Sequence, residues 1–459
     1  MNNTQHRLDA VRKVLSQREK LPQDEHYARN IMVEYRQCDE EGIDVAPYRA
    51  LFEGVRDMPD GEFRERFAEV IGDMVLNLPR RADYPYNEPS DLEGIRALRD
   101  LSLWQDAPVD EGILRERITG AWLGRICGCL LGKPIEGMRT DELHPLLKGS
   151  DNYPMHRYIT SKDYTAEQQA GWRFQVRPVA LADLIDCAPS DDDTNYTVLY
   201  QKLIEERGRD FTPGDVMQLW LRNQRKDAYF TAERVAYGNF IRGYLPPDSA
   251  IHQNPFREWI GAQIRADYFG YINPGKPEAA ADMAWRDASV SHIKNGIYGE
   301  MWAAAMIACA AVCDDIEKVI LGGLAQIPST SRLFRDVMSI VNDWRRGVPA
   351  ADVFARIHTE WDEHNVHDWC HTNSNAMIVA ACLLYGNGDY GKSICLAVET
   401  GFDTDCNGAT VGSVLGMMKG PAIISEEWLK PVNGRVKTEI FGMQTVTVEE
   451  FVNKTLTHL

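Results

Sequence analysis

Apolar residues recur at every third or fourth position along most of the chain, which is the spacing of amphipathic helices. The pattern is clear at residues 10–15 and 63–76. Residues 301–313 form one continuous apolar run, which is too short to cross a bilayer and is typical of a buried helix. Residues 113–430 show no convincing pair of alternating strands. The pattern therefore predicts an all-α fold, with a short C-terminal β-hairpin formed by residues 434–440 and 444–448.

Two parts of the chain differ in their chemistry. Residues 1–112 have the pattern of helices with charged faces and contain no cluster of reactive side chains, and residues 81–89 form a turn-rich connector with two prolines. We therefore predict an N-terminal helical module over residues 1–112 and a function-bearing domain over residues 113–459. Residues 152–188 have no clear period, and their length indicates a functional lid or short elements.

Glycine repeats at every fourth position in two separate stretches. The two sets are Gly120, Gly124, Gly128 and Gly132, and Gly408, Gly412, Gly416 and Gly420. Residues four apart lie on one face of a helix. Glycine inside a helix costs roughly 1 kcal/mol relative to alanine, so a regular ridge of glycines indicates a packing requirement. We predict that the two ridges pack against each other at close range.

Carboxylates gather at two points that are distant in sequence. Asp191, Asp192 and Asp193 are consecutive, and Asp403 and Asp405 directly precede the second glycine ridge. One interpretation is helix capping, because a helix N-terminus favours negative charge. The other is a shared cation site, since adjacent carboxylates repel one another and oxygen ligands suit Mg²⁺, Ca²⁺ or Mn²⁺.

Several further side chains allow two interpretations. Glu136 follows Pro134 at the end of the first glycine helix, and it is either a site residue or a solvated loop carboxylate. The aromatic residues at 268–271 either pack in the core or receive a planar ring or a sugar. The spacing of a group of three histidines and one cysteine fits either a soft-metal site or ordinary hydrogen bonding within a helix or loop. This group consists of His364, His367, Cys370 and His371.

Charge and cysteine usage narrow the class of protein. The net charge is −18, from 68 acidic and 50 basic residues, and such a surface repels nucleic acids and anionic membranes. The 10 cysteines show no paired CxxC spacing, so neither a disulfide framework nor a zinc ribbon is indicated. With no secretion signal at the N-terminus, these features predict a cytoplasmic protein that binds neither nucleic acid nor membrane.

Three motifs, in this order, resemble those of the ADP-ribosylglycohydrolase family. The first runs from Gly124 through Gly132 and Pro134 to Glu136, the second is Asp192-Asp193-Thr194, and the third is Gly401 to Asp405 followed by the second glycine ridge. The similarity covers roughly residues 113–430. It implies an orthogonal helical bundle with two Mg²⁺ ions, or Mn²⁺, in a central cleft.

The resemblance also implies roles for individual residues. The metal ligands would be Asp191, Asp192, Asp193, Asp403, Asp405 and Cys406. Glu136 or Asp192 would be the general base, while Gly261, Arg265 and His292 would contact substrate. Three positions depart from the family pattern: Asp191 stands where Thr or Ser is usual, Cys406 stands where Thr is usual, and Gln263-Ile264 replaces a different pair. A neutral thiol is a poor Mg²⁺ ligand.

The expected activity is hydrolysis of a glycosidic bond, in particular an N-glycosidic bond, to ADP-ribose or a related ribosyl group. The partner would be an ADP-ribosylated protein or a small ribosylated substrate. Two alternatives stand beside this one: a glycosidase of a small ribosylated or glycosylated metabolite, and a non-catalytic relative that binds ADP-ribose.

Overall fold

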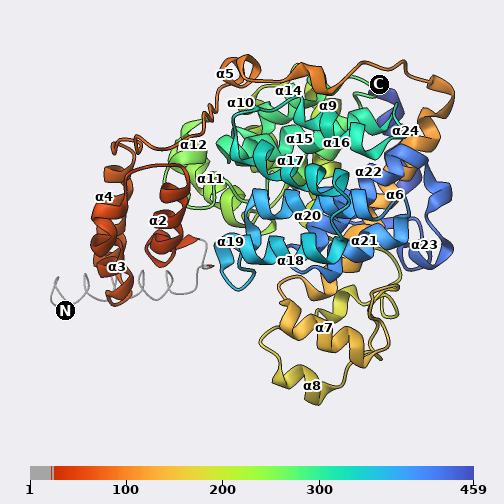
Figure 1. The fold of residues 1–459 in the computed structure, drawn as a ribbon, viewed down its shortest axis with the longest axis horizontal. Helices are drawn as coiled ribbons and strands as arrows, with labels where there is room; N and C mark the ends of the chain where they lie inside the picture. Colours follow the sequence, from red (N-terminus) through yellow and green to blue (C-terminus); the bar gives the residue numbers. More distant parts are fainter. Residues whose placement is uncertain (1–21, 23–24) are drawn as a thin grey trace, which may run out of the picture.

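The computed structural model describes residue 22 and residues 25–459, and over this range the fold is all-α, as predicted (Figure 1). The helix expected near residues 10–15 lies outside the described residues. Among the described residues there is one sheet, the antiparallel pair β1 (Arg435–Lys437) and β2 (Thr445–Thr447), with Val436 opposite Val446. This pair confirms the predicted C-terminal hairpin. No described helix is both long and apolar enough to span a membrane.

Helices α6 (Leu114–Gly132) and α22 (Thr404–Lys419) form the centre of the molecule and carry the two glycine ridges. A Cβ atom added to Gly124 would collide with the carbonyl oxygen of Gly412, and one added to Gly128 would collide with that of Gly408. The reciprocal additions on α22 meet the α6 backbone in the same way. The predicted ridge-to-ridge packing is therefore confirmed, and it places the two backbones in direct contact.

The other helices of the main body surround this pair. Their bounds are α9 (Asp192–Arg207), α10 (Pro213–Asn223), α11 (Thr231–Arg242), α12 (Asp248–Ile251), α13 (Asp267–Tyr271), α14 (Pro277–Ala288), α15 (Lys294–Ala310), α16 (Ile316–Leu324), α17 (Arg332–Arg345), α18 (Ala350–Glu360), α19 (Val366–Cys370), α20 (Thr372–Tyr385), α21 (Tyr390–Glu399), α23 (Glu426–Val432) and α24 (Val448–Thr457). Helix α15 is buried along its whole length, as the apolar run predicted. Tyr268, Phe269 and Tyr271 are buried in the core, which decides between the two interpretations of that aromatic segment.

An N-terminal group of helices packs against one side of the main body (Figure 1). It consists of α2 (Ile31–Glu40), α3 (Arg49–Asp57) and α4 (Glu62–Val75), and it has a small hydrophobic core of its own that extends from Tyr27 to Val75. We call these helices the N-terminal module. The connector that follows contains α5 (Leu92–Ala97), whose Ile95 already packs in the main core. The predicted division at residue 112 stays a prediction.

A second group of elements projects from the lower side of the body in Figure 1. It contains α7 (Thr140–Gly149), α8 (Ala166–Gly171) and the irregular chain between and after them. The segment without a clear period thus consists of short elements and loops. Its last part brings Arg177 back to the main body, where the arginine pairs with Glu136.

Candidate functional site

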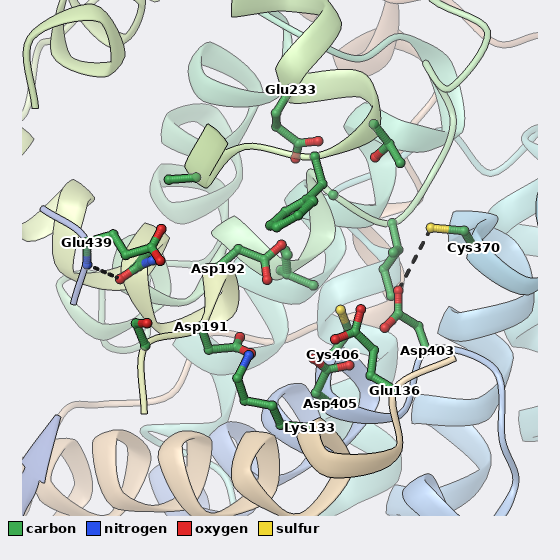
Figure 2. Close-up of a pocket in the computed structure, with 18 of the residues that line it drawn as sticks. Lys133, Glu136, Asp191, Asp192, Glu233, Cys370, Asp403, Asp405, Cys406 and Glu439 are labelled. Atoms are coloured by element: carbon green, nitrogen blue, oxygen red, sulfur yellow. Dashed lines mark hydrogen bonds and ion pairs between the residues drawn. The ribbon is translucent and has the colours of Figure 1, made fainter. Parts of the chain in front are cut away.

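A cavity of about 290 Å³ lies where the loop after α6 meets the N-terminal ends of α9 and α22. Carboxylates from these three segments face it (Figure 2). They are Glu136, Asp191, Asp192, Asp403 and Asp405. The two acidic clusters, which are about two hundred residues apart in sequence, therefore share one cavity.

The α22 side of the cavity begins with an unusual turn. Gly401 and Phe402 both have positive φ angles, 80° and 58°, and Phe402 is a buried residue in the left-handed region. Asp403 follows at the N-cap position but makes no capping hydrogen bond, and Asp405 lies in the first helical turn. The Oδ1 atoms of Asp403 and Asp405 are buried, and no described residue is a hydrogen-bond partner of either. Capping does not explain these two carboxylates.

The α9 side of the cavity is internally paired. Asp191 caps the helix by accepting a hydrogen bond from the Asp193 backbone N–H at 2.9 Å, and it also forms an ion pair with Lys133. Asp193 lies one layer deeper and does not line the cavity. Its Oδ1 accepts from Arg125 Nη2 at 3.2 Å, and Arg125 also holds Asp267 at 2.9 Å. Asp192, between them, is the member of this trio that is partly exposed to the cavity.

The unequal pairing appears in the pKa values. Burial, followed by the nearby Glu136 carboxylate, raises the pKa of Asp403 to about 6 and that of Asp405 well above its usual range. Burial and the adjacent carboxylates likewise raise the pKa of Asp192. Burial alone would raise the pKa of Asp191 as well, but the Lys133 ammonium and the hydrogen bonds that Asp191 accepts outweigh it and lower that pKa. The cavity therefore carries more negative charge than its own cations balance.

The donor set fits a hard divalent cation. Single ligand atoms of Asp403, Asp405 and Cys406 all lie within 4.8 Å of one another, and the same holds for Cys129, Asp191 and Asp193. Carboxylate oxygens without partners are the ligands that such an ion prefers. Burial raises the pKa of the Cys406 thiol well above its usual range, so the thiol stays protonated and is a weak donor to Mg²⁺. The carboxylates, rather than Cys406, are suited to hold the ion.

Two of the three predicted substrate contacts lie away from the cavity. Gly261 lines it, and a Cβ at this position would collide with the Glu233 carboxylate. Arg265 is fully buried behind the wall, where it pairs with Glu233 at 2.8 Å and with Asp287 at 2.6 Å. His292 is also buried and borders a different cavity. Neither Arg265 nor His292 lines the cavity in this structure, and their role as substrate contacts stays a prediction.

Of the four residues in the 364–371 group, the structure brings two together. His367 and His371 meet Glu40 of the N-terminal module, whereas His364 is exposed and Cys370 faces the cavity instead. No local pattern in the sequence connects Glu40 with this group.

The cavity also contains residues that the sequence motifs did not predict. Four of them are Lys133, Arg177, Glu233 and Trp369. Lys133 precedes Pro134 within the first motif, so its position was a usable signal. The other three stand alone in segments without a motif, and only the tertiary fold reveals them.

Comparisons with known proteins give one family. A sequence model described as ADP-ribosylglycohydrolase matches residues 110–455. Among solved structures, the chain is similar to one titled "ADP-ribosylglycohydrolase-related protein complex", with 16% sequence identity and a TM-score of 0.47 over 76% of this chain and 98% of that chain. A search of curated proteins returned no match.

Proposed function

The chain belongs to the ADP-ribosylglycohydrolase family, and we propose that it is a metal-dependent hydrolase of an N-glycosidic bond to ADP-ribose or a related ribosyl group. The family has a glycohydrolase role, is typically metal-dependent and acts on ADP-ribosylated substrates. The observation that carries the proposal concerns Asp403 and Asp405, which line the same cavity as Asp191, Asp192 and Glu136. Their buried Oδ1 atoms have no hydrogen-bond partner in the part of the chain that the structure describes.

Two Mg²⁺ or Mn²⁺ ions would be held by the carboxylates of this cavity. Asp403 and Asp405 would hold one, and Asp191, Asp192 and Asp193 the other. Ligand atoms of Asp191 and Asp193 lie within 4.8 Å of each other, and Asp193 Oδ2 has no hydrogen-bond partner among the described residues. When bound, such ions lower the pKa of a coordinated water and orient sugar hydroxyl groups.

The chain itself supplies the proton acceptor and the negative surroundings. Asp192 has a raised pKa and no described hydrogen-bond donor, so it is suited to take a proton from an attacking water. Glu136, held by Arg177, is the other candidate for this role. The remaining carboxylates stabilise positive charge that develops on the sugar as the glycosidic bond breaks.

The size of the cavity favours a second candidate substrate class. Ligand sites usually measure about 300–1,000 Å³, and this cavity, at about 290 Å³, is at the lower limit. It can enclose a ribosyl group more readily than a whole ADP-ribose. A glycosidase of a small ribosylated metabolite is therefore the alternative.

A substrate panel distinguishes these candidates. The protein with Mg²⁺ would be incubated with ADP-ribosyl-arginine, ADP-ribosyl-serine, nucleosides and simple glycosides, and the released groups followed by mass spectrometry. Turnover of either ADP-ribosyl compound supports the first proposal, and turnover of nucleosides alone supports the second. Metal binding in calorimetry without turnover of any compound would indicate a binding protein, and absence of metal binding would contradict the metal site.

A further inference from the structure

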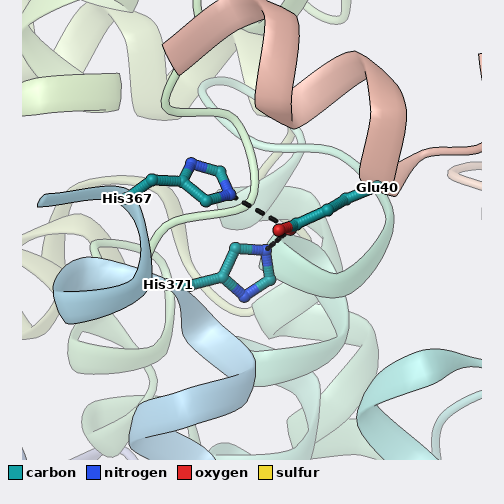
Figure 3. Close-up of side chains that lie close together, drawn as sticks. All are labelled: Glu40, His367 and His371. Carbon is teal, nitrogen blue, oxygen red and sulfur yellow. Dashed lines mark hydrogen bonds and ion pairs between the residues drawn. The ribbon is translucent and has the colours of Figure 1, made fainter. Parts of the chain in front are cut away.

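Helix α2 of the N-terminal module contacts the back of one wall of the catalytic cavity. This wall consists of residues 258–261 and 367–372, and we call it the cavity wall. Gln37 donates to Glu258 Oε2 at 2.7 Å, and Glu40 Oε2 accepts from His367 Nε2 at 3.0 Å. His371 Nε2 lies 3.5 Å from the same Glu40 oxygen (Figure 3).

The geometry of Glu40, His367 and His371 resembles a metal site, but their hydrogen bonds oppose one. The indole N–H of Trp259 donates to His367 Nδ1 at 3.0 Å, and the backbone N–H of Asn373 donates to His371 Nδ1 at 3.1 Å. Each Nδ1 is therefore an acceptor, and in the neutral ring the proton is on Nε2. A metal-binding histidine normally has the reverse arrangement, with its other nitrogen donating. The Nε2–H of His367 instead donates to the Glu40 carboxylate, and that of His371 lies 3.5 Å from it, without a hydrogen-bond partner among the described residues.

Glu40 accepts a hydrogen bond from His367 and lies against His371 without a hydrogen bond to it. Burial by itself would raise the pKa of Glu40, but its interaction with His367 and the attraction of Arg332 outweigh it. The pKa of Glu40 therefore lies well below its usual range, and the side chain is an anion. Burial lowers the pKa of His371, which keeps that ring neutral. The other charged groups around this cluster belong to Arg36, Arg332, Glu258 and Asp368.

The two segments of the cavity wall are joined to each other. Ile260 N–H donates to the Cys370 carbonyl at 2.9 Å, and Thr372 N–H donates to the Glu258 carbonyl at 3.1 Å. Displacement of His367 or His371 would therefore move both segments. Gln37 and Glu40 hold one segment each, from the same helix.

The front of the wall reaches the carboxylates. Trp369, which lies between the two histidines in sequence, lines the cavity and donates its indole N–H to the Phe402 carbonyl at 2.6 Å. Cys370 Sγ lies 3.9 Å from Asp403 Oδ2. A chain of contacts thus runs from Glu40 through the histidines and Trp369 to the turn that precedes Asp403.

We propose that Glu40 is a positioning residue of the catalytic site, which holds His367, packs against His371 and thereby sets the place of Trp369 against the bound ribosyl substrate. This inference rests on the proposed function. It gives the N-terminal module a direct part in substrate binding, although the module lines none of the cavity. The effect is expected on substrate affinity rather than on the bond-breaking step, because the carboxylates belong to other segments.

The first test compares Glu40→Gln with Asp60→Asn. The Glu40→Gln substitution keeps the shape of the side chain but removes its charge and leaves one buried Nε2–H poorly paired. Asp60 pairs with Arg29 and Arg64 within the module and contacts neither wall segment, so Asp60→Asn is a matched control. With the substrate identified by the panel, we expect KM to rise about tenfold in Glu40→Gln, which corresponds to about 1.4 kcal/mol, with kcat within about twofold. Asp60→Asn should leave both values unchanged. An unchanged KM in Glu40→Gln would overturn the proposal, as would an equal rise in the control.

A second measurement needs no substrate. With 5-fluorotryptophan incorporated, the ¹⁹F resonance that disappears in Trp369→Phe identifies this side chain among the 11 tryptophans. It should shift in Glu40→Gln and not in Asp60→Asn. A resonance that stays in place contradicts the positioning role even if the panel reveals no activity, and a shift supports it independently of the proposed reaction.

A double-mutant cycle tests whether Glu40 acts through His367. The KM of Glu40→Gln combined with His367→Gln should lie within about twofold of either single variant, because both remove the same contact. If the KM of the double variant rises by the product of the two single fold-changes, Glu40 and His367 act independently and the inference is overturned. If Glu40→Gln does not fold, Glu40→Asp, which keeps the charge on a shorter side chain, takes its place in all three measurements.

Discussion

The two helix ends that meet at the cavity carry similar carboxylates, but those carboxylates have different partners. At the start of α9, Asp191 has a capping bond and Lys133, and Asp193 has Arg125. At the start of α22, Asp403 and Asp405 each keep a buried oxygen without a partner among the described residues. The fold thus supplies cations to Asp191 and Asp193 at the α9 end, here called the balanced end. No described residue forms an ion pair with Asp403 or Asp405 at the α22 end, here called the unbalanced end. Similar residues at similar positions therefore have different roles, and the variants below separate the two ends.

The largest effect is expected at the balanced end, from Arg125→Met. The substitution leaves Asp193 and Asp267 buried without their common cation. Breaking a buried ion pair in this way costs about 3–5 kcal/mol, to be measured as the free energy of unfolding in urea. Arg117→Met on the same helix is the control, because Arg117 pairs with exposed Asp314 and should lose less than about 1 kcal/mol. Equal losses in the two variants would contradict the distinction.

At the unbalanced end, Asp403→Asn should remove function without unfolding the protein. Loss of one preorganised charged group typically lowers the rate by about 10²–10³-fold, and the affinity for Mg²⁺ should fall with it. Turnover and calorimetry would be compared with those of Asp389→Asn, which changes an exposed helix-capping aspartate on α21. Full activity in Asp403→Asn would refute the assignment of this carboxylate to the metal.

Without metal, the Asp403 carboxyl should make the free energy of unfolding depend on pH, and Asp403→Asn should remove this dependence. An unfolded Asp loses its proton near pH 3.9, but the pKa of folded Asp403 is about 6. Below about pH 4 the proton is bound in both states and has no effect. Between about pH 4 and 6 the folded protein retains a proton that the unfolded chain releases, so Asp403 increasingly destabilises the fold as pH rises.

With EDTA present, Asp403→Asn should therefore become more stable than wild type by about 2–3 kcal/mol at pH 8 and match it near pH 3.5. Added Mg²⁺ should restore the wild type and not the variant. A stability difference that is independent of pH would contradict the raised pKa.

The smallest effect is expected when the balanced end is made to resemble the other. Lys133→Met leaves Asp191 without its ammonium, which adds net negative charge to the cavity. Mg²⁺ should bind a few-fold more tightly, a change of about 1 kcal/mol, as measured by calorimetry. Lys133→Arg keeps the charge and should bind like wild type. If Mg²⁺ binds more weakly to Lys133→Met, the lysine orients Asp191 for the ion rather than competing with the ion for this carboxylate.

The periodic features of the fold, such as the glycine ridges, were predictable from the sequence. The ion pairs between distant side chains were not. The glycine ridges indicate their partner because glycine at every fourth helical position leaves a strip of bare backbone, which a second bare backbone can cover closely. Once α6 and α22 pack, Glu136 and Asp405 have to lie near each other. The balancing role of Arg125 could not be foreseen, because it contacts Asp193 and Asp267 from a position that looks like one more residue of the first ridge helix.

Arg265 and His292 show what a resemblance leaves open. A motif carries a sequence position but not the direction of its side chain, and here both side chains turn into the core. Glu40 shows the limit of local patterns, since nothing near it in sequence indicates contact with residues more than three hundred positions away. The raised pKa values likewise follow from burial, which only the folded chain defines.

The glycine seam between α6 and α22 also decides which parts of the molecule can move during turnover. Carbonyl groups of one helix lie against the Cα atoms of the other without intervening side chains, so sliding or rotation of either helix meets hard atomic contact within a fraction of an ångström. The floor that carries Glu136 and Asp405 is thus held rigidly. We therefore expect any rearrangement on substrate binding to occur in the projecting α7–α8 region rather than in this base.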